Sequence, residues 1–285
     1  MNESVLSFDC EGETLVGVLA EPAGPLAEVG VVIIVGGPQY RAGSHRQFTL
    51  LARHLAAHGV AALRFDYRGM GDSTGDARDF LAVEADIRAA IDALLAARPA
   101  LKRVVLWGLC DAASAALLYV DATHDARVAG LALLNPWARS AASLAQTHLK
   151  HYYWRRLGQK EFWLKLLRGG VGGTALRTLA GNLRLARQAG QRTGPEDNRS
   201  FQDRMASGLR GFGGPVLLVL SGDDYTAREF AGHVASSASW QGLLQRPTLA
   251  LHDMPTADHT FSTLADQDSQ CHLCLDWLRT RCLAS

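Results

Sequence analysis

The segment Val104–Ala113, V-V-L-W-G-L-C-D-A-A, constrains the fold more than any other part of the chain. Its apolar run stops at Gly108, Cys110 follows two residues later, and Ala112 begins a helix-forming tail. A nucleophile flanked at two residues' distance by small side chains is typical of a sharp strand-to-helix turn that strains the backbone. Bulkier side chains at Gly108 or Ala112 would clash in such a turn. We therefore predict that Cys110 lies between a buried strand and a helix.

Two interpretations of Cys110 are open from this segment. As a nucleophile, its thiolate would point out of the sheet at the N-terminus of a helix, where amide dipoles favour negative charge. As a structural residue, it would be a buried cysteine in an ordinary strand–helix turn. Asp111 bears on the choice, because a carboxylate beside a thiolate is unfavourable unless its side chain turns away and caps the helix.

The composition indicates a globular α/β protein. The chain has 285 residues, of which 48% are hydrophobic and 20% charged, with a formal net charge of +1. This fits one α/β domain with an insertion, or two small domains. No secretory signal is evident at the N-terminus, and no apolar run reaches the ~20 residues of a membrane helix. The cysteines are odd in number and lack a framework spacing, which favours free thiols and a cytoplasmic location.

Apolar strands alternate with amphipathic helices along most of the chain. The expected strands are 3–9, 13–20, 29–35, 60–65, 103–107, 128–134, 216–220 and 248–252. The expected helices are 46–58, 83–97, 111–120, 226–236 and 267–281. Because most of these strands are continuously apolar, we expect a mostly parallel central sheet of about eight strands with helices on both faces.

The alternation breaks between Pro136 and Gly214. We predict a core of residues 1–136 and 214–285, and an inserted helical cap over 137–213. Residues 137–212 carry 14 Lys and Arg but only 4 Asp and Glu. This basic cap has three interpretations: a solvated face, recognition of an anionic substrate such as an acyl-carrier thioester, or docking on an anionic membrane surface. No nucleic-acid partner is expected, since no matching fold motif is present.

A candidate acid and a candidate base follow Cys110 along the chain, in the order that is typical of this strand-to-helix turn. S-G-D-D directly follows the strand 216–220, where an acid that orients the base is expected. Asp224 is favoured over Asp223 because it lies two residues after Gly222. Either carboxylate could instead cap the helix 226–236, and both roles can coexist. His259, in the loop T-A-D-H-T-F-S before the last helix, is the expected base.

The loop after strand 29–35 should supply part of an oxyanion hole. We expect the N–H of Asp111 to act with one N–H from the loop G-G-P-Q-Y. Pro38 has no N–H, so the second donor is Gln39 or Gly37, and Gln39 is preferred. The alternative is a glycine-rich turn without function, and the pattern of a phosphate loop is absent.

Other residues are weaker candidates. We expect Gly37, His45 and Trp137 to contact a substrate. The C-H-L-C sequence from Cys271 to Cys274 has no second ligand pair and is interpreted as incidental rather than as a metal or redox site. The expected chemistry therefore needs no metal and no cofactor.

With these residues in view, the chain resembles the α/β-hydrolase superfamily. Within it, the chain is similar to the exosortase A system-associated hydrolases of the first type. The residues that carry this resemblance are V-G-G-P-Q-Y-R-A-G-S-H-R-Q-F (35–48), L-R-F-D-Y-R-G-M-G-D-S (63–73), L-W-G-L-C-D-A-A-S-A-A (106–116), L-L-N-P-W (133–137), S-G-D-D-Y-T-A-R-E-F (221–230) and D-H-T-F-S (258–262). That family is associated with bacterial exopolysaccharide clusters that accompany a protein-sorting system. The resemblance therefore implies a cytoplasmic enzyme that acts on an acylated or ester-containing precursor. The superfamily's usual serine is Cys110 here.

A cysteine nucleophile narrows the expected chemistry. A thiolate attacks activated carbonyls such as thioesters, lactones and enol esters, and its acyl-enzyme is itself a thioester. We therefore expect a hydrolase that cleaves a small-molecule ester or thioester with a Cys110–His259–Asp224 triad. The alternatives are an acyltransferase that modifies a polysaccharide or lipid precursor, and a non-catalytic binding protein with the same fold. The sequence does not indicate an oligomeric state.

Overall fold

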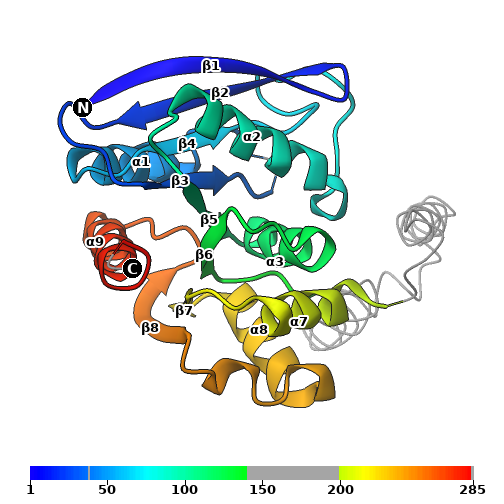
Figure 1. Cartoon of the computed structure of the whole chain (residues 1–285). Helices are drawn as coiled ribbons and strands as arrows, with labels where there is room; N and C mark the ends of the chain where they lie inside the picture. The colour runs from blue at the N-terminus through cyan, green and yellow to red at the C-terminus, as the bar shows by residue number, and fades with distance from the viewer. Residues whose placement is uncertain (38, 140–198, 284–285) are drawn as a thin grey trace, which may run out of the picture. The chain divides into compact units, whose positions relative to one another are not determined.

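The computed structural model describes residues 1–37, 39–139 and 199–283. They form an eight-stranded sheet with the strand order β1-β2-β4-β3-β5-β6-β7-β8 (Figure 1). The strands are β1 (Asn2–Cys10), β2 (Glu13–Glu21), β3 (Val29–Ile34), β4 (Ala62–Phe65), β5 (Arg103–Leu109), β6 (Val128–Leu134), β7 (Val216–Asp223) and β8 (Leu249–Asp258). The pairs β1–β2 and β2–β4 are antiparallel, and the others are parallel. The predicted α/β fold with a mostly parallel sheet is confirmed.

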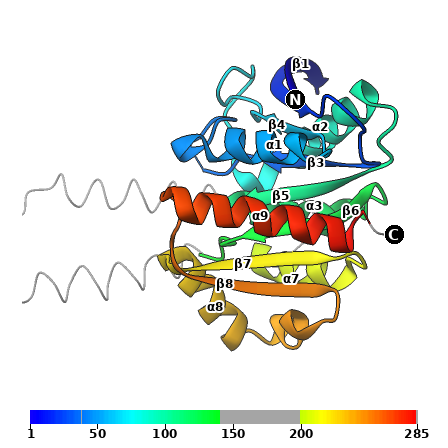
Figure 2. The same cartoon turned by 90° about the vertical axis from the view of Figure 1, so that its left-hand side faces the viewer.

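Helices cover both faces of the sheet. The α-helices are α1 (Gln47–Ala57), α2 (Glu84–Ala97), α3 (Asp111–Thr123), α7 (Phe201–Gly211), α8 (Tyr225–Ser236) and α9 (Leu264–Arg281). The 3-10 helices are η1 (Ser44–Arg46), η2 (Phe80–Ala82), η3 (Ala238–Trp240) and η4 (Leu243–Gln245). Helices α1 and α9 lie on one face, and α2, α3, α7 and α8 lie on the other (Figures 1 and 2).

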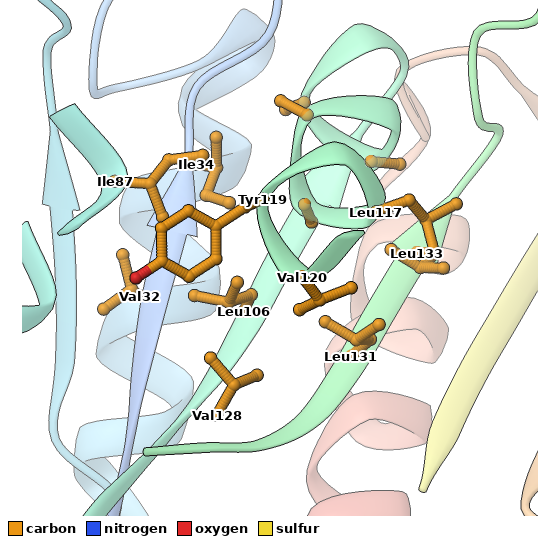
Figure 3. Close-up of a cluster of buried hydrophobic side chains, with 14 of the residues drawn as sticks. Val32, Ile34, Ile87, Leu106, Leu117, Tyr119, Val120, Val128, Leu131 and Leu133 are labelled. Atoms are coloured by element: carbon orange, nitrogen blue, oxygen red, sulfur yellow. The ribbon is translucent and has the colours of Figure 1, made fainter. Parts of the chain in front are cut away.

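Alternation along the strands divides the core into two layers. Val32 and Ile34 of β3 point to the face that α2 and α3 cover (Figure 3). Val31 and Ile33 point to the opposite face, where α1 and α9 pack. Because both faces of the strand are buried, its sequence is continuously apolar instead of alternating. The same pattern in β5 and β6 anchors the turn at Cys110.

Strand β8 is longer than the prediction of 248–252. Its backbone pairs with β7 as far as Asp223 and Asp258, past the end of its apolar residues. The apolar pattern therefore predicted too short a strand, because backbone pairing with β7 continues through polar residues. Pro255 is tolerated because β8 lies at the edge of the sheet, where a missing N–H costs no ladder bond.

The structure divides into two units, residues Met1–Ala138 with Ser200–Ser285, and residues Arg139–Arg199. This differs from the predicted cap of 137–213, because α7 belongs to the core. Helix α7 packs closely on α3: a Cβ at Gly208 would lie 2.2 Å from the carbonyl oxygen of Leu117. Residues 140–198 of the predicted cap, and the basic face expected there, lie outside the described residues. Among the helices that the structure describes, none is long and apolar enough to cross a membrane.

Candidate active site

Cys110 occupies a strained turn between β5 and α3. Its backbone has φ 62° and ψ −127°, a conformation that costs a non-glycine residue about 1–3 kcal/mol. The turn is also crowded, because a Cβ at Gly108 would lie 2.5 Å from the carbonyl carbon of Ala112. The Cys110 N–H donates to Leu134 on the neighbouring strand at 2.9 Å. These contacts hold the cysteine at the carboxyl end of the sheet.

Cys110 differs from the other cysteines in its surroundings. It is partly exposed, whereas the other four are buried, and all five are free thiols. Burial raises the pKa of the Cys10 and Cys274 thiols to about 11. It raises the pKa of the Cys271 and Cys282 thiols to about 12. Those four side chains are therefore neutral and inaccessible near neutral pH.

The pairing of β7 with β8 brings an acid and a base together. Asp223 and Asp258 are paired residues at the ends of these strands, so Asp224 and His259 follow side by side. His259 Nδ1 lies 2.8 Å from Asp224 Oδ2. Gly222 permits this close approach, because a Cβ there would lie 2.3 Å from the carbonyl oxygen of Pro255.

The Asp224 carboxylate both caps helix α8 and contacts His259. Asp224 is the N-cap of α8, where its side chain accepts the N–H groups of Thr226 at 2.9 Å and Ala227 at 3.2 Å. The same buried side chain holds His259. Asp223 is exposed at the end of β7. Asp224, rather than Asp223, is therefore the acid in contact with the histidine.

The imidazole of His259 lies between Asp224 and Cys110. Hydrogen bonding with Asp224, and then with Cys110, raises the pKa of His259 from 6.5 to about 10, although burial opposes the shift. His259 therefore carries a proton near neutral pH. Because Nδ1 faces Asp224, Nε2 is the nitrogen available to the cysteine. Asp224 therefore holds the orientation of the imidazole and stabilises its charged form.

Asn135 supports the histidine loop and did not figure among the sequence candidates. This fully buried residue has φ 44° at the end of β6. Its amide exchanges hydrogen bonds with Ser221, at 2.8 Å from the Ser221 N–H and 2.9 Å to the hydroxyl. It also donates to the His259 carbonyl at 3.4 Å. A polar residue between an apolar strand and a proline, in L-L-N-P-W, was the available signal.

The N–H groups of both candidate oxyanion donors, Gln39 and Gly37, make hydrogen bonds in the structure. The Gln39 N–H donates to the Gly37 carbonyl at 2.8 Å, and its side chain accepts the Ser44 N–H at 2.9 Å. Gln39 is thus committed within its own loop. The Gly37 N–H instead points toward the start of α3, where it donates to the Asp111 carboxylate at 2.7 Å.

The predicted substrate contacts fall in different places. Gly37 lines a cavity of about 390 Å³ together with Asp111. The main chain of Trp137 is tied to the turn, donating to the Cys110 carbonyl at 3.2 Å and accepting from the Ser114 hydroxyl at 2.7 Å. His45 is exposed in η1 and lines neither this cavity nor the cavity of about 470 Å³ beside Gln39. The contact of His45 with a substrate therefore stays a prediction.

The C-H-L-C sequence lies on α9, where Cys271 and Cys274 pack in the core. Among residues 1–37, 39–139 and 199–283, no group of three or more His, Cys, Asp or Glu side chains is arranged to hold a metal ion.

The sheet order, the strained turn and the acid and base beyond it define the α/β-hydrolase class of proteins. The family model of the alpha/beta hydrolase family matches residues 31–270, so the chain belongs to this family. A comparison with curated proteins found no match.

Solved structures of low sequence identity share the fold. The esterase Pf2001 of Pyrococcus furiosus is 14% identical with a TM-score of 0.64, over 99% of this chain and 93% of its own. Est1E of Butyrivibrio proteoclasticus, solved with ferulic acid, is 16% identical with a TM-score of 0.61, over 97% and 98%. XC6422 of Xanthomonas campestris, described as a serine hydrolase without lid, is 15% identical with a TM-score of 0.59, over 98% and 95%.

Proposed function

We propose that this protein is a cysteine-dependent acyl hydrolase that cleaves an ester or thioester. One observation carries the proposal: the His259 imidazole lies 2.8 Å from Asp224, and interaction with Cys110 is among the causes that raise its pKa. A nucleophile, a base and a group that orients the base are the arrangement that acyl transfer requires. Membership of the alpha/beta hydrolase family supports the same chemistry.

The catalytic cycle uses the proton that His259 holds. Cys110 attacks the acyl carbon as a thiolate, forming the sulfur–carbon bond and a tetrahedral oxyanion. His259 then donates its proton to the leaving oxygen or sulfur, and the acyl-enzyme thioester remains. Neutral His259 next removes a proton from water, whose oxygen attacks the thioester, and Cys110 leaves as a thiolate. Asp224 keeps the imidazole oriented throughout.

The substrate class follows from the nucleophile. Thiolates react well with activated carbonyls, so thioesters and activated esters are the favoured small-molecule substrates. The resemblance to exosortase A system-associated hydrolases favours an acylated or ester-containing precursor of bacterial exopolysaccharide metabolism, and a cytoplasmic site of action. The four other free thiols agree with a reducing compartment.

The test is detection of the acyl-enzyme. The protein is mixed with short-chain p-nitrophenyl esters or acyl-coenzyme A thioesters, quenched in acid, and analysed by intact mass and peptide mapping. We expect one acyl group on Cys110 in the wild type and none in Cys110→Ala. Cys274→Ala is the matched control and should still be acylated. Equal turnover by wild type and Cys110→Ala on every accepted substrate would contradict the proposal.

The acceptor decides between hydrolysis and acyl transfer. Because a thioester intermediate retains transfer potential, products are analysed in the presence of an added sugar acceptor. Release of the free acid alone supports a hydrolase. An acylated sugar would assign the protein as an acyltransferase with the same nucleophile. Absence of any adduct across the donor series would favour a non-catalytic binding protein.

A further inference from the structure

The Asp111 side chain turns back from the start of α3 toward the end of β3. Its Oδ1 accepts the Gly37 N–H at 2.7 Å. The carboxylate also packs against the backbone of Gly36, where a Cβ would lie 2.4 Å from Oδ1. This contact joins residues 74 positions apart in the chain, so it links the two loops that flank the nucleophile.

These loops are the ones that should form the oxyanion hole. In this type of turn, the N–H after the nucleophile acts with an N–H from the loop after β3. Here those groups belong to Asp111 and Gly37. The N–H groups of Gly37, Ala112 and Asp111 itself all stabilise the Asp111 carboxylate. A side-chain carboxylate therefore sits where the oxyanion of an acyl-transfer intermediate should bind.

The cavity beside Asp111 provides an alternative position for its carboxylate. Asp111 and Gly37 line the cavity of about 390 Å³, which Tyr67 also lines. Tyr67 is buried, and its hydroxyl has no hydrogen-bond partner in the described part of the chain. A buried donor without a partner is unfavourable, so this hydroxyl is a ready partner for a carboxylate that moves into the cavity.

Few other charges act on Asp111. Asp79 and Arg78 line the same cavity, and the charge of Asp79 raises the pKa of the Asp111 carboxyl, although burial is the larger cause. The described residues contain no cation paired with Asp111. Cys110 precedes Asp111 in the turn, so an oxyanion formed by attack of Cys110 lies close to this carboxylate. Repulsion between these two negative charges favours displacement of the Asp111 carboxylate as the substrate is attacked.

We propose that Asp111 occupies the oxyanion hole of the resting enzyme, and that the substrate's carbonyl oxygen displaces it from Gly37 toward the Tyr67 hydroxyl. The inference rests on the proposed function, because it concerns the oxyanion formed at Cys110. Asp111 is thus an internal competitor of the substrate. Its presence lowers the affinity of the hole for weakly bound carbonyl groups, and a productive substrate must supply enough binding energy to overcome it.

An aldehyde tests this competition without turnover. Butanal adds the Cys110 thiol across its carbonyl: the sulfur–carbon bond forms, the carbonyl π bond breaks, and the proton ends on the oxygen in the hole. Its affinity is measured as protection of Cys110 from iodoacetamide, read by peptide mass. We expect Asp111→Ala to bind butanal roughly tenfold more tightly than wild type, the scale of one hydrogen bond to a charged group. Asp111→Asn, which keeps an acceptor oxygen but loses the charge, should lie between them.

Two further variants separate displacement from a purely structural role. Tyr67→Phe should weaken butanal binding in the wild type and leave it unchanged in the Asp111→Ala background, because no carboxylate then needs a new partner. Asp79→Asn, the control for charge in the cavity, should change the affinity less than twofold. Thermal unfolding of each variant checks that it is folded.

The outcomes distinguish the inference from the proposed function. If Asp111→Ala is folded but binds butanal no more tightly than wild type, Asp111 only stabilises the start of α3 and the inference is wrong. If Tyr67→Phe weakens binding equally in both backgrounds, displacement toward Tyr67 is wrong. In both cases Cys110 still binds the aldehyde, so the proposed function stands. Absence of protection in every variant would overturn both.

Discussion

Cys110 and the pair Cys271 and Cys274 carry the same side chain in opposite settings. Cys110 sits in a strained turn, partly exposed, with His259 beside it. Cys271 and Cys274 lie on the inner face of α9, a regular helix, and burial raises the pKa of both thiols. Residue type and even the suggestive C-x-x-C spacing therefore do not mark the reactive thiol. We expect backbone geometry and a neighbouring histidine to mark it instead.

The comparison also shows where conformational strain is tolerated. The turn at Cys110 has a φ of 62°, and glycines at 36 and 108 are needed where a Cβ would meet neighbouring atoms within 2.5 Å. Helix α9 has neither a strained backbone nor crowded glycines, and its cysteines pack in the core as ordinary apolar side chains do. Backbone strain of this kind is found most often at functional sites.

Removal of the Cys110 thiol is the strongest test of this contrast. Cys110→Ala should lower turnover of any accepted ester or thioester by at least about a thousandfold, because no other side chain can replace the nucleophile. Cys271→Ala should leave turnover per folded molecule within about twofold of wild type, because its site lies outside the nucleophile's turn. Steady-state kinetics measure both. If folded Cys271→Ala loses most of its turnover, the contrast between Cys110 and the cysteines of α9 is wrong.

Removal of the charge that orients His259 should have the next largest effect. Asp224→Asn should lower turnover and the rate of Cys110 alkylation by about a hundredfold, since the amide favours the wrong imidazole tautomer. Asparagine is also a good N-cap, so α8 should remain formed. Asp223→Asn, at the exposed neighbouring position, is the matched control and should alter both rates little. Similar rates for the two variants would rule out an orienting role for Asp224.

The strain of the turn can be tested through stability. Gly108→Ala should reduce the free energy of unfolding by at least about 2 kcal/mol, because the new methyl group must displace the Ala112 backbone. Gly213→Ala is the control, since a Cβ there meets nothing within 4 Å. Urea unfolding followed by circular dichroism measures both. An unaffected Gly108→Ala would mean that the turn is looser than the structure indicates.

The pH dependence of stability should show the smallest effect. His259 has its pKa raised from 6.5 to about 10, so the stability from its charged form is complete below pH 6.5 and is lost as the pH rises through 10. The imidazole is 34% exposed, and solvent screening reduces the effect to roughly 1 kcal/mol. The difference in unfolding free energy between wild type and His259→Gln should therefore shrink between pH 6.5 and 10.5. A constant difference over that range would contradict the raised pKa.

The local pattern of apolar residues was sufficient to predict much of the fold. The continuously apolar strands 29–35 and 128–134 match β3 and β6 closely, because burial on both faces leaves a signature that does not depend on distant contacts. The limits of β8 were missed, since pairing with β7 prolongs it through polar residues. Helix α7 was assigned to the cap, because its amphipathic sequence does not reveal that it packs on α3.

The candidate site was likewise predictable in part from the sequence. Chain order and strand ends predicted that Cys110, Asp224 and His259 belong to one candidate site, because parallel strands bring their carboxyl ends to one edge. The choice between Gln39 and Gly37, and the substrate contacts, could not be derived in the same way, since loop conformation decides which N–H groups are free and which side chains face the cavity.

The sequence by itself determined the alternation of strands and helices, the small residues around Cys110 and the order of the candidate nucleophile, acid and base. Each depends on the size and polarity of neighbouring residues along the chain. Only the tertiary structure decided that Asp111 turns toward Gly37 and that Asn135 supports the histidine loop. Those contacts join residues 74 and 124 positions apart, and hydrogen-bond direction between such distant groups depends on how the strands pack.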